Sequence, residues 1–137
     1  MSHRLASCII SVAVLLLPTT LQAAPITIYS SLGPGNTFQT NSAWQVFGSN
    51  SGNGLFEEAA TFKPSSSVLL TQIDIALAWF GGTNSVVVTL NSDSGGFPGS
   101  AIASWTVNNL SFFGTLQTLL PSTTLSLAAG QSYWIVA

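Results

Sequence analysis

The feature that most constrains this fold is an alternation of apolar with polar or small residues over residues 68–80. Odd-numbered positions hold the apolar residues Leu69, Ile73, Ile75, Leu77 and Trp79. Even-numbered positions hold the polar or small residues Gln72, Asp74, Ala76 and Ala78. Successive side chains of a β-strand point to opposite faces, so the pattern predicts one strand with a single face in a core. Residues 81–84, all Gly, Thr or Asn, interrupt the alternation, which resumes over residues 85–91. A β-hairpin that joins the two strands is the simplest interpretation.

Shorter apolar runs, separated by turns rich in Gly, Asn, Ser and Pro, fill the rest of the chain. They cover residues 26–29, 42–47, 58–62, 102–107, 116–119, 123–127 and 132–136. About eight or nine strands at this spacing are typical of all-β proteins. The sequence therefore predicts one domain over residues 24–137, folded as a two-sheet antiparallel β-sandwich that is jelly-roll-like.

Residues 1–23 have the three-part pattern of a secretory signal peptide. Arg4 lies in a short polar start, an apolar run follows over residues 8–17, and Ala23 offers a small residue for cleavage. The apolar run is about half as long as the ~20 residues that a membrane-spanning helix needs. An uncleaved anchor is the alternative. We therefore expect export, with no membrane span in the mature chain.

Charged residues make up only 4% of the chain, against about 25% in an ordinary soluble domain. Arg4 and Lys63 are its two basic residues, which excludes a nucleic-acid binder because neutralising phosphates takes many Lys and Arg. His3 and Cys8 are single and lie in the expected leader. This excludes metal sites built on His or Cys and catalysis that depends on His, and we expect no cofactor.

The acidic residues also argue against an enzyme. Glu57 and Glu58 are adjacent, so on a strand they point to opposite faces and cannot flank one glycosidic bond. Glu57 with Asp74 or Asp93 remains a geometrically open pair. With no His after the leader, the usual activation of a nucleophilic serine is missing. We expect a protein without enzymatic activity.

Residues 91–96 (NSDSGG) carry side-chain oxygens at alternate positions and Gly at the sixth, as in a calcium loop. Asn91 and Asp93 are therefore candidate calcium ligands. The twelfth position, where a bidentate Glu belongs, is Ile102. The alternative, which we favour, is a turn in which the Asp93 side chain caps its own backbone and the two glycines adopt positive φ.

Aromatic side chains are the remaining candidates for ligand binding, because exposed rings can stack on sugars while Asn, Ser and Thr bond to their hydroxyl groups. Trp44 lies close to the loop 48–54 and is one candidate, with a core position as the equal alternative. Tyr133 and Trp134 are neighbours on a predicted strand and face opposite ways, which makes Trp134 a second candidate. Trp79 ends an apolar parity and is assigned to the core.

Six segments occur in an order that is more specific than any one of them. They are residues 32–38 (LGPGNTF), 59–62 (AATF), 73–77 (IDIAL), 82–88 (GTNSVVV), 91–100 (NSDSGGFPGS) and 127–134 (LAAGQSYW). Together they resemble the choice-of-anchor R domain of exported bacterial proteins. The resemblance covers most of residues 29–137 and implies export and a β-sandwich, with no established activity and no catalytic residues.

Members of such families typically carry a C-terminal sorting signal, often of the PEP-CTERM kind, and this sequence has none. It stops within an apolar run, residues 134–137, whereas domains normally end in exposed polar segments. Either the last strand docks in a sheet or the natural protein continues, and we favour continuation.

The function predicted from the sequence is an exported, non-catalytic structural or adhesive module of the bacterial cell surface or extracellular matrix. Its expected partners are extracellular polysaccharides or matrix proteins. The alternative is a carbohydrate-binding module that uses loop aromatics. A hydrolase or calcium-dependent enzyme, and a protein that assembles edge to edge, are further hypotheses.

Overall fold

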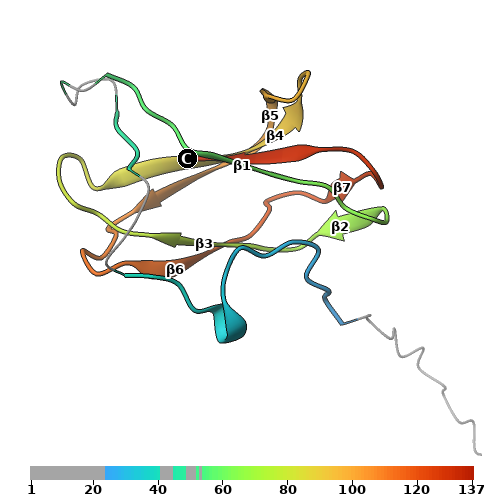
Figure 1. Ribbon diagram of the computed structural model, residues 1–137, viewed down its shortest axis with the longest axis horizontal. Coiled ribbons are helices and arrows are strands. Elements are labelled where there is room, and N and C mark those ends of the chain that lie inside the picture. The colour runs from blue at the N-terminus through green and yellow to red at the C-terminus, as the bar shows by residue number, and fades with distance from the viewer. Residues whose placement is uncertain (1–23, 41–44, 49–51, 53) are drawn as a thin grey trace, which may run out of the picture.

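The computed structural model describes residues 24–40, 45–48, 52 and 54–137. Of these residues, 45% are in strands and 3% are helical, which confirms the prediction of an all-β fold with antiparallel sheets (Figure 1). After a short 3-10 helix, η1 (Pro34–Asn36), the described residues form eight strands. They are β1 (Ala59–Phe62), β2 (Val68–Leu70), β3 (Ile73–Leu77), β4 (Ser85–Asp93), β5 (Pro98–Asn108), β6 (Thr115–Leu119), β7 (Leu125–Leu127) and β8 (Tyr133–Val136).

The larger sheet has four antiparallel strands in the order β1-β8-β4-β5. Its hairpin is β4–β5, and the turn closes through a hydrogen bond of 2.8 Å from the Ser94 backbone N–H to the Phe97 carbonyl. Gly95 and Gly96 adopt positive φ values of 66° and 89°, which glycine reaches without a Cβ clash. The last strand, β8, lies between β1 and β4 and is thus an interior strand of this sheet.

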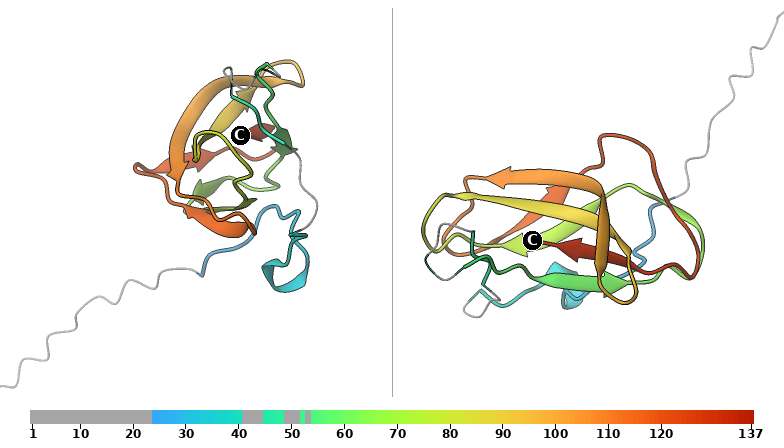
Figure 2. Two further views of the ribbon diagram at one scale, coloured as in Figure 1. Left: turned by 90° about the vertical axis from the view of Figure 1, so that its left-hand side faces the viewer. Right: turned by 90° about the horizontal axis from the view of Figure 1, so that it is seen from above.

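Two two-stranded ladders lie across the interior from the larger sheet (Figures 1 and 2). β2 pairs with β7, and β3 pairs with β6, both antiparallel. Only Thr71 and Gln72 separate β2 from β3, whereas residues 120–124 separate β6 from β7. The two ladders therefore follow one another along the chain as a ribbon two strands wide.

The predicted hairpin between residues 68–80 and 85–91 is wrong. β3 pairs with β6, while β4 pairs with β5 and β8, so the connection between β3 and β4 crosses from the ribbon to the larger sheet. The single predicted strand is also split into β2 and β3, because the positions that face the interior change from even to odd numbers at residues 71–72. Val68 and Leu70 pack inward before this break, and Ile73, Ile75 and Leu77 pack inward after it. Leu69, which was predicted to face the core, is 62% exposed.

Two apolar clusters fill the space between the larger sheet and the ribbon. One contains Val88, Val107, Leu110 and Leu119, and the other contains Leu90, Leu127 and Tyr133. Trp105 and Ile135 pack against both clusters, so the interior is continuous. Trp79 packs against the first cluster, in agreement with its predicted core position.

Two predicted strands near the N-terminus have different outcomes. Residues 26–29 form no strand; apolar contacts hold them instead, since Ile28 packs against the second cluster and Tyr29 stacks on Phe62 with ring centroids 6.0 Å apart. Half of the predicted strand 42–47, residues 42–44, lies outside the described residues, and residues 45 and 46 form no strand. Its last residue, Phe47, forms an isolated bridge with Phe56.

The predicted signal peptide, residues 1–23, lies outside the described residues. Within the part of the chain that the structure describes, no helix has the length and apolar character needed to cross a bilayer.

Candidate functional site

The structure brings three predicted site residues together at the end of β4. Trp134 is the register partner of Asn91, and its indole Nε1–H donates a hydrogen bond of 2.8 Å to Oδ1 of Asp93. The neighbour of Trp134, Tyr133, is buried on the inner face, where its hydroxyl accepts from the Ala128 N–H at 2.9 Å. Trp134 is half-buried on the outer face. The fourth predicted residue, Trp44, lies outside the described residues.

Asp93 makes a capped turn. Its second oxygen, Oδ2, accepts from the Gly96 N–H at 3.2 Å. The indole of Trp134 and then the Gly96 N–H hold the pKa of Asp93 below its usual value, because both bonds favour the ionised form. Each carboxylate oxygen therefore already accepts a hydrogen bond within the chain.

Asn91 lies beside this turn, and only one of the two polar atoms of its side chain has a hydrogen-bond partner. Its Nδ2 donates to the Gly99 carbonyl at 2.8 Å, whereas its buried Oδ1 has no hydrogen-bond partner among the described residues. Among all the residues that the structure describes, no three His, Cys, Asp or Glu side chains lie close enough together to bind a metal ion. Asn91 and Asp93 remain candidate ligands by sequence, and their observed hydrogen bonds are to Gly99, Gly96 and Trp134 of the chain itself.

A second group of residues, which the sequence analysis missed, forms an exposed aromatic surface at the opposite end of β4. We call Phe80, Phe112 and Phe113 the phenylalanine platform. Their side chains are 59%, 54% and 77% exposed. Phe80 meets Phe112 edge-on at a centroid distance of 5.4 Å, and Phe112 meets Phe113 edge-on at 5.6 Å. Edge-to-face contacts at these distances are favourable, so the rings support one another.

Two loops carry the platform, and hydrogen bonds join them. The Asn84 side chain accepts from the Leu110 N–H at 2.7 Å and donates to the Leu110 carbonyl at 3.0 Å. The backbone N–H of Trp79 also donates to the Ser111 carbonyl at 3.0 Å. Leu110 is buried in the first cluster, which ties one loop to the core. The platform is therefore exposed on a fixed base.

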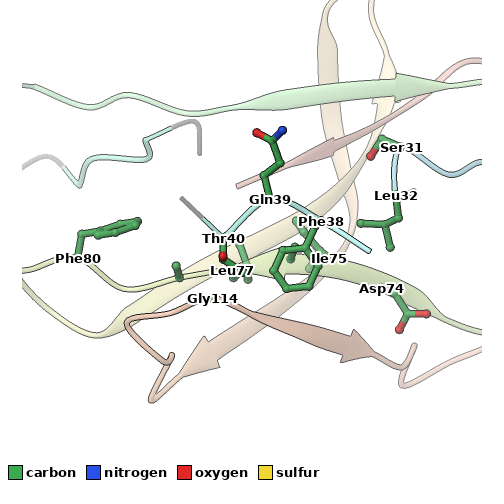
Figure 3. A pocket seen from close by; sticks show the side chains of 12 residues that line it. Ser31, Leu32, Phe38, Gln39, Thr40, Asp74, Ile75, Leu77, Phe80 and Gly114 are labelled. Atoms are coloured by element: carbon green, nitrogen blue, oxygen red, sulfur yellow. The ribbon is translucent and has the colours of Figure 1, made fainter. Parts of the chain in front are cut away.

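A groove of about 400 Å³ adjoins the platform (Figure 3). It runs between residues 31–40 and β3, with Phe80 at one end and Asp74 at the other (Figure 3). Among the residues lining it are Ala76, Ala78 and Gly114, whose small size leaves the groove open. Phe38 lies beside Gly114: its Cε2 is 3.5 Å from the point where a Cβ of that glycine would lie.

The one carboxylate of the groove, that of Asp74, accepts two hydrogen bonds from side chains of the same chain. Its Oδ2 accepts from Gln72 Nε2 and its Oδ1 accepts from Thr118 Oγ1, both at 2.7 Å. Gln39 and Thr40 are exposed on the opposite side. The lining thus combines aromatic rings, uncharged hydrogen-bonding groups and one carboxylate, with no cation.

One sequence signal could have identified the platform. Phe112 and Phe113 are adjacent, so they cannot both face the interior of a strand, and Gly114 follows them directly. Phe80 likewise precedes Gly81. Aromatic residues placed against turn residues, outside the alternating runs, mark rings carried by loops. Comparison of the chain with family models, with curated proteins and with solved structures finds no match in any of the three.

Proposed function

We propose that this chain is an exported, non-catalytic structural or adhesive module of the bacterial cell surface or extracellular matrix. The signal-peptide pattern of residues 1–23 and the resemblance to the choice-of-anchor R domain support export. The facing of the larger sheet and the two-stranded ribbon supports a sandwich of jelly-roll-like type as its architecture.

The phenylalanine platform is the observation that carries the adhesive role. Exposed apolar patches mark sites of interaction, whereas isolated exposed apolar residues are ordinary. Here Phe112 contacts both Phe80 and Phe113, and each of the three rings is more than half exposed. The loops that carry them are joined by hydrogen bonds between Asn84 and Leu110. A surface that is fixed before binding loses little conformational entropy on contact, which favours adhesion.

The hydrogen bonds of two acidic side chains support a non-catalytic role. Asp93 is held ionised by Trp134 and Gly96, so it is a poor proton donor near neutral pH. Asp74 accepts from Gln72 and Thr118. Both carboxylates thus take part in structural bonds, and they lie on different sheets.

Adhesion can be tested with the full chain released by a secreting bacterial host. Retention is measured on a layer of isolated bacterial extracellular matrix, for the native protein and for a triple variant in which Phe80, Phe112 and Phe113 become Ser. We expect the triple variant to lose most of its retention. Phe97→Ser is the matched control, because Phe97 is 73% exposed in the β4–β5 turn. Equal retention of all three proteins would contradict the proposal.

Export is tested on the same preparation. Mass spectrometry of the released protein should show a chain that begins at Ala24. A released or membrane-bound product that keeps residues 1–23 would contradict cleavage at the predicted position.

A further inference from the structure

We propose that the groove between residues 31–40 and β3 binds a neutral polysaccharide, whose chain continues onto the phenylalanine platform. This inference rests on the proposed function and gives the adhesive surface a ligand class. It places sugar binding at Phe38 and Phe80, away from Trp134. The volume of about 400 Å³ lies within the range of about 300–1,000 Å³ that is usual for ligand sites.

Aromatic rings lie at intervals from the groove to the platform. Phe38 lies within the groove and Phe80 lies at one end of it (Figure 3). Phe80 also contacts Phe112 on the platform. Sugar rings present apolar C–H faces that pack on aromatic rings, and a polymer repeats that face along its length. A groove that opens onto further rings therefore suits an extended chain.

The polar groups provide partners for hydroxyl groups. Ser31, Gln39 and Thr40 are exposed at the groove and carry both donors and acceptors. The Asp74 carboxylate is oriented by Gln72 and Thr118 and keeps lone pairs for a further donor. Such bonds to an ionised acceptor are stronger than neutral ones, so Asp74 would fix the position of one sugar.

Charge selects neutral polymers over acidic ones. The lining residues include one carboxylate and no cation, and Lys63 is the single basic residue after the predicted leader. An acidic polysaccharide would meet Asp74 without a compensating positive charge. Uncharged glycans do not pay this electrostatic penalty.

Affinity electrophoresis of the native protein tests the inference, with hydroxyethyl cellulose and dextran as neutral probes and alginate as the acidic probe. We expect retardation by at least one neutral polymer and none by alginate. Phe80→Ser and Phe38→Ser should each weaken this binding about tenfold, as expected for the loss of one central aromatic contact. Phe97→Ser should bind as the native protein does.

A second variant guards against a folding defect. Ala76→Tyr fills the groove and leaves every platform residue in place, so it should also abolish retardation while the far-ultraviolet circular dichroism stays native. Binding that survives Ala76→Tyr, or equal retardation by alginate, would overturn the inference.

The remaining outcomes separate this inference from the proposed function. Matrix retention that depends on the platform but is not competed by either neutral polymer would leave the adhesive role and overturn the sugar ligand. Concentration-dependent self-association blocked by Ala76→Tyr would show that a second protein chain occupies the groove, and would also overturn it.

Discussion

The side-chain amide of Asn84 and the backbone of Leu110 make a pair of hydrogen bonds, one in each direction, at 2.7 and 3.0 Å. The amide thus does for Leu110 what a neighbouring strand would do, one residue beyond the last backbone hydrogen bond between the two segments, from the Asn109 N–H to the Asn84 carbonyl at 3.3 Å. Residues 26 positions apart in the sequence are joined in this way, and the loops on either side carry Phe80 and Phe112.

Asn84→Ala should lower the free energy of unfolding by about 1–3 kcal/mol, because it leaves the N–H and the carbonyl of Leu110 without partners in a partly buried site. Asn84→Asp keeps the acceptor for the N–H and loses the donor, so its loss should be smaller. Urea denaturation measures both. Equal, negligible losses would show that the two bonds contribute nothing to stability.

Trp134→Phe should raise the pKa of Asp93 towards the ordinary value of an aspartate, because the largest cause of its lowering is the indole hydrogen bond. A lowered native pKa gives stability that is present above the unfolded pKa and is lost as the pH falls through the native pKa. The native protein should therefore lose more stability on acidification below about pH 4 than Trp134→Phe does. Thermal unfolding between pH 2 and 7 tests this, with Asp93→Asn as the control that lacks the titrating group.

Gly99→Ala should destabilise the β4–β5 hairpin by about 1–3 kcal/mol through overpacking. A Cβ on Gly99 would lie 2.8 Å from Ser92 Oγ and 3.1 Å from the Ser92 carbonyl oxygen. Glycine permits this approach where the register of β4 and β5 shifts. Ser100→Ala, at the exposed next position, should be nearly neutral. Calorimetric unfolding of the two variants gives the comparison, and a neutral Gly99→Ala would contradict the close approach.

Leu90→Ala should lower the free energy of unfolding by about 2–5 kcal/mol, because Leu90 is 0% exposed and its loss leaves a cavity. Leu69→Ala removes the same atoms from a residue that is 62% exposed, and should change stability by less than about 0.5 kcal/mol. Chemical denaturation distinguishes them. A large loss for Leu69→Ala would restore the single strand over residues 68–80 that the alternation predicted.

The strands themselves could be predicted because alternation is a local property. The predicted strands 116–119 and 132–136 agree with β6 and β8 to within a residue at either end. Their partners could not be predicted in the same way. The choice between a hairpin at residues 81–84 and a crossover depends on whether β3 pairs with β4 or with β6, and β6 lies about 40 residues further along the chain, so no local pattern indicates it.

The candidate site was less predictable than the fold. The sequence drew attention to Trp134 and Asp93 separately, but the bond between them joins residues 41 positions apart. The platform was missed because phenylalanine is usually buried, and only the packing of two distant loops leaves Phe80 and Phe112 exposed together.

Trp105 and Ile135 belong to the walls of both apolar clusters. Neither half of the interior can loosen without disturbing these two side chains, so heat should melt the molecule in a single step. The platform at one end of β4 and the β4–β5 turn at the other are thereby attached to a single interior, and neither end should unfold ahead of the other.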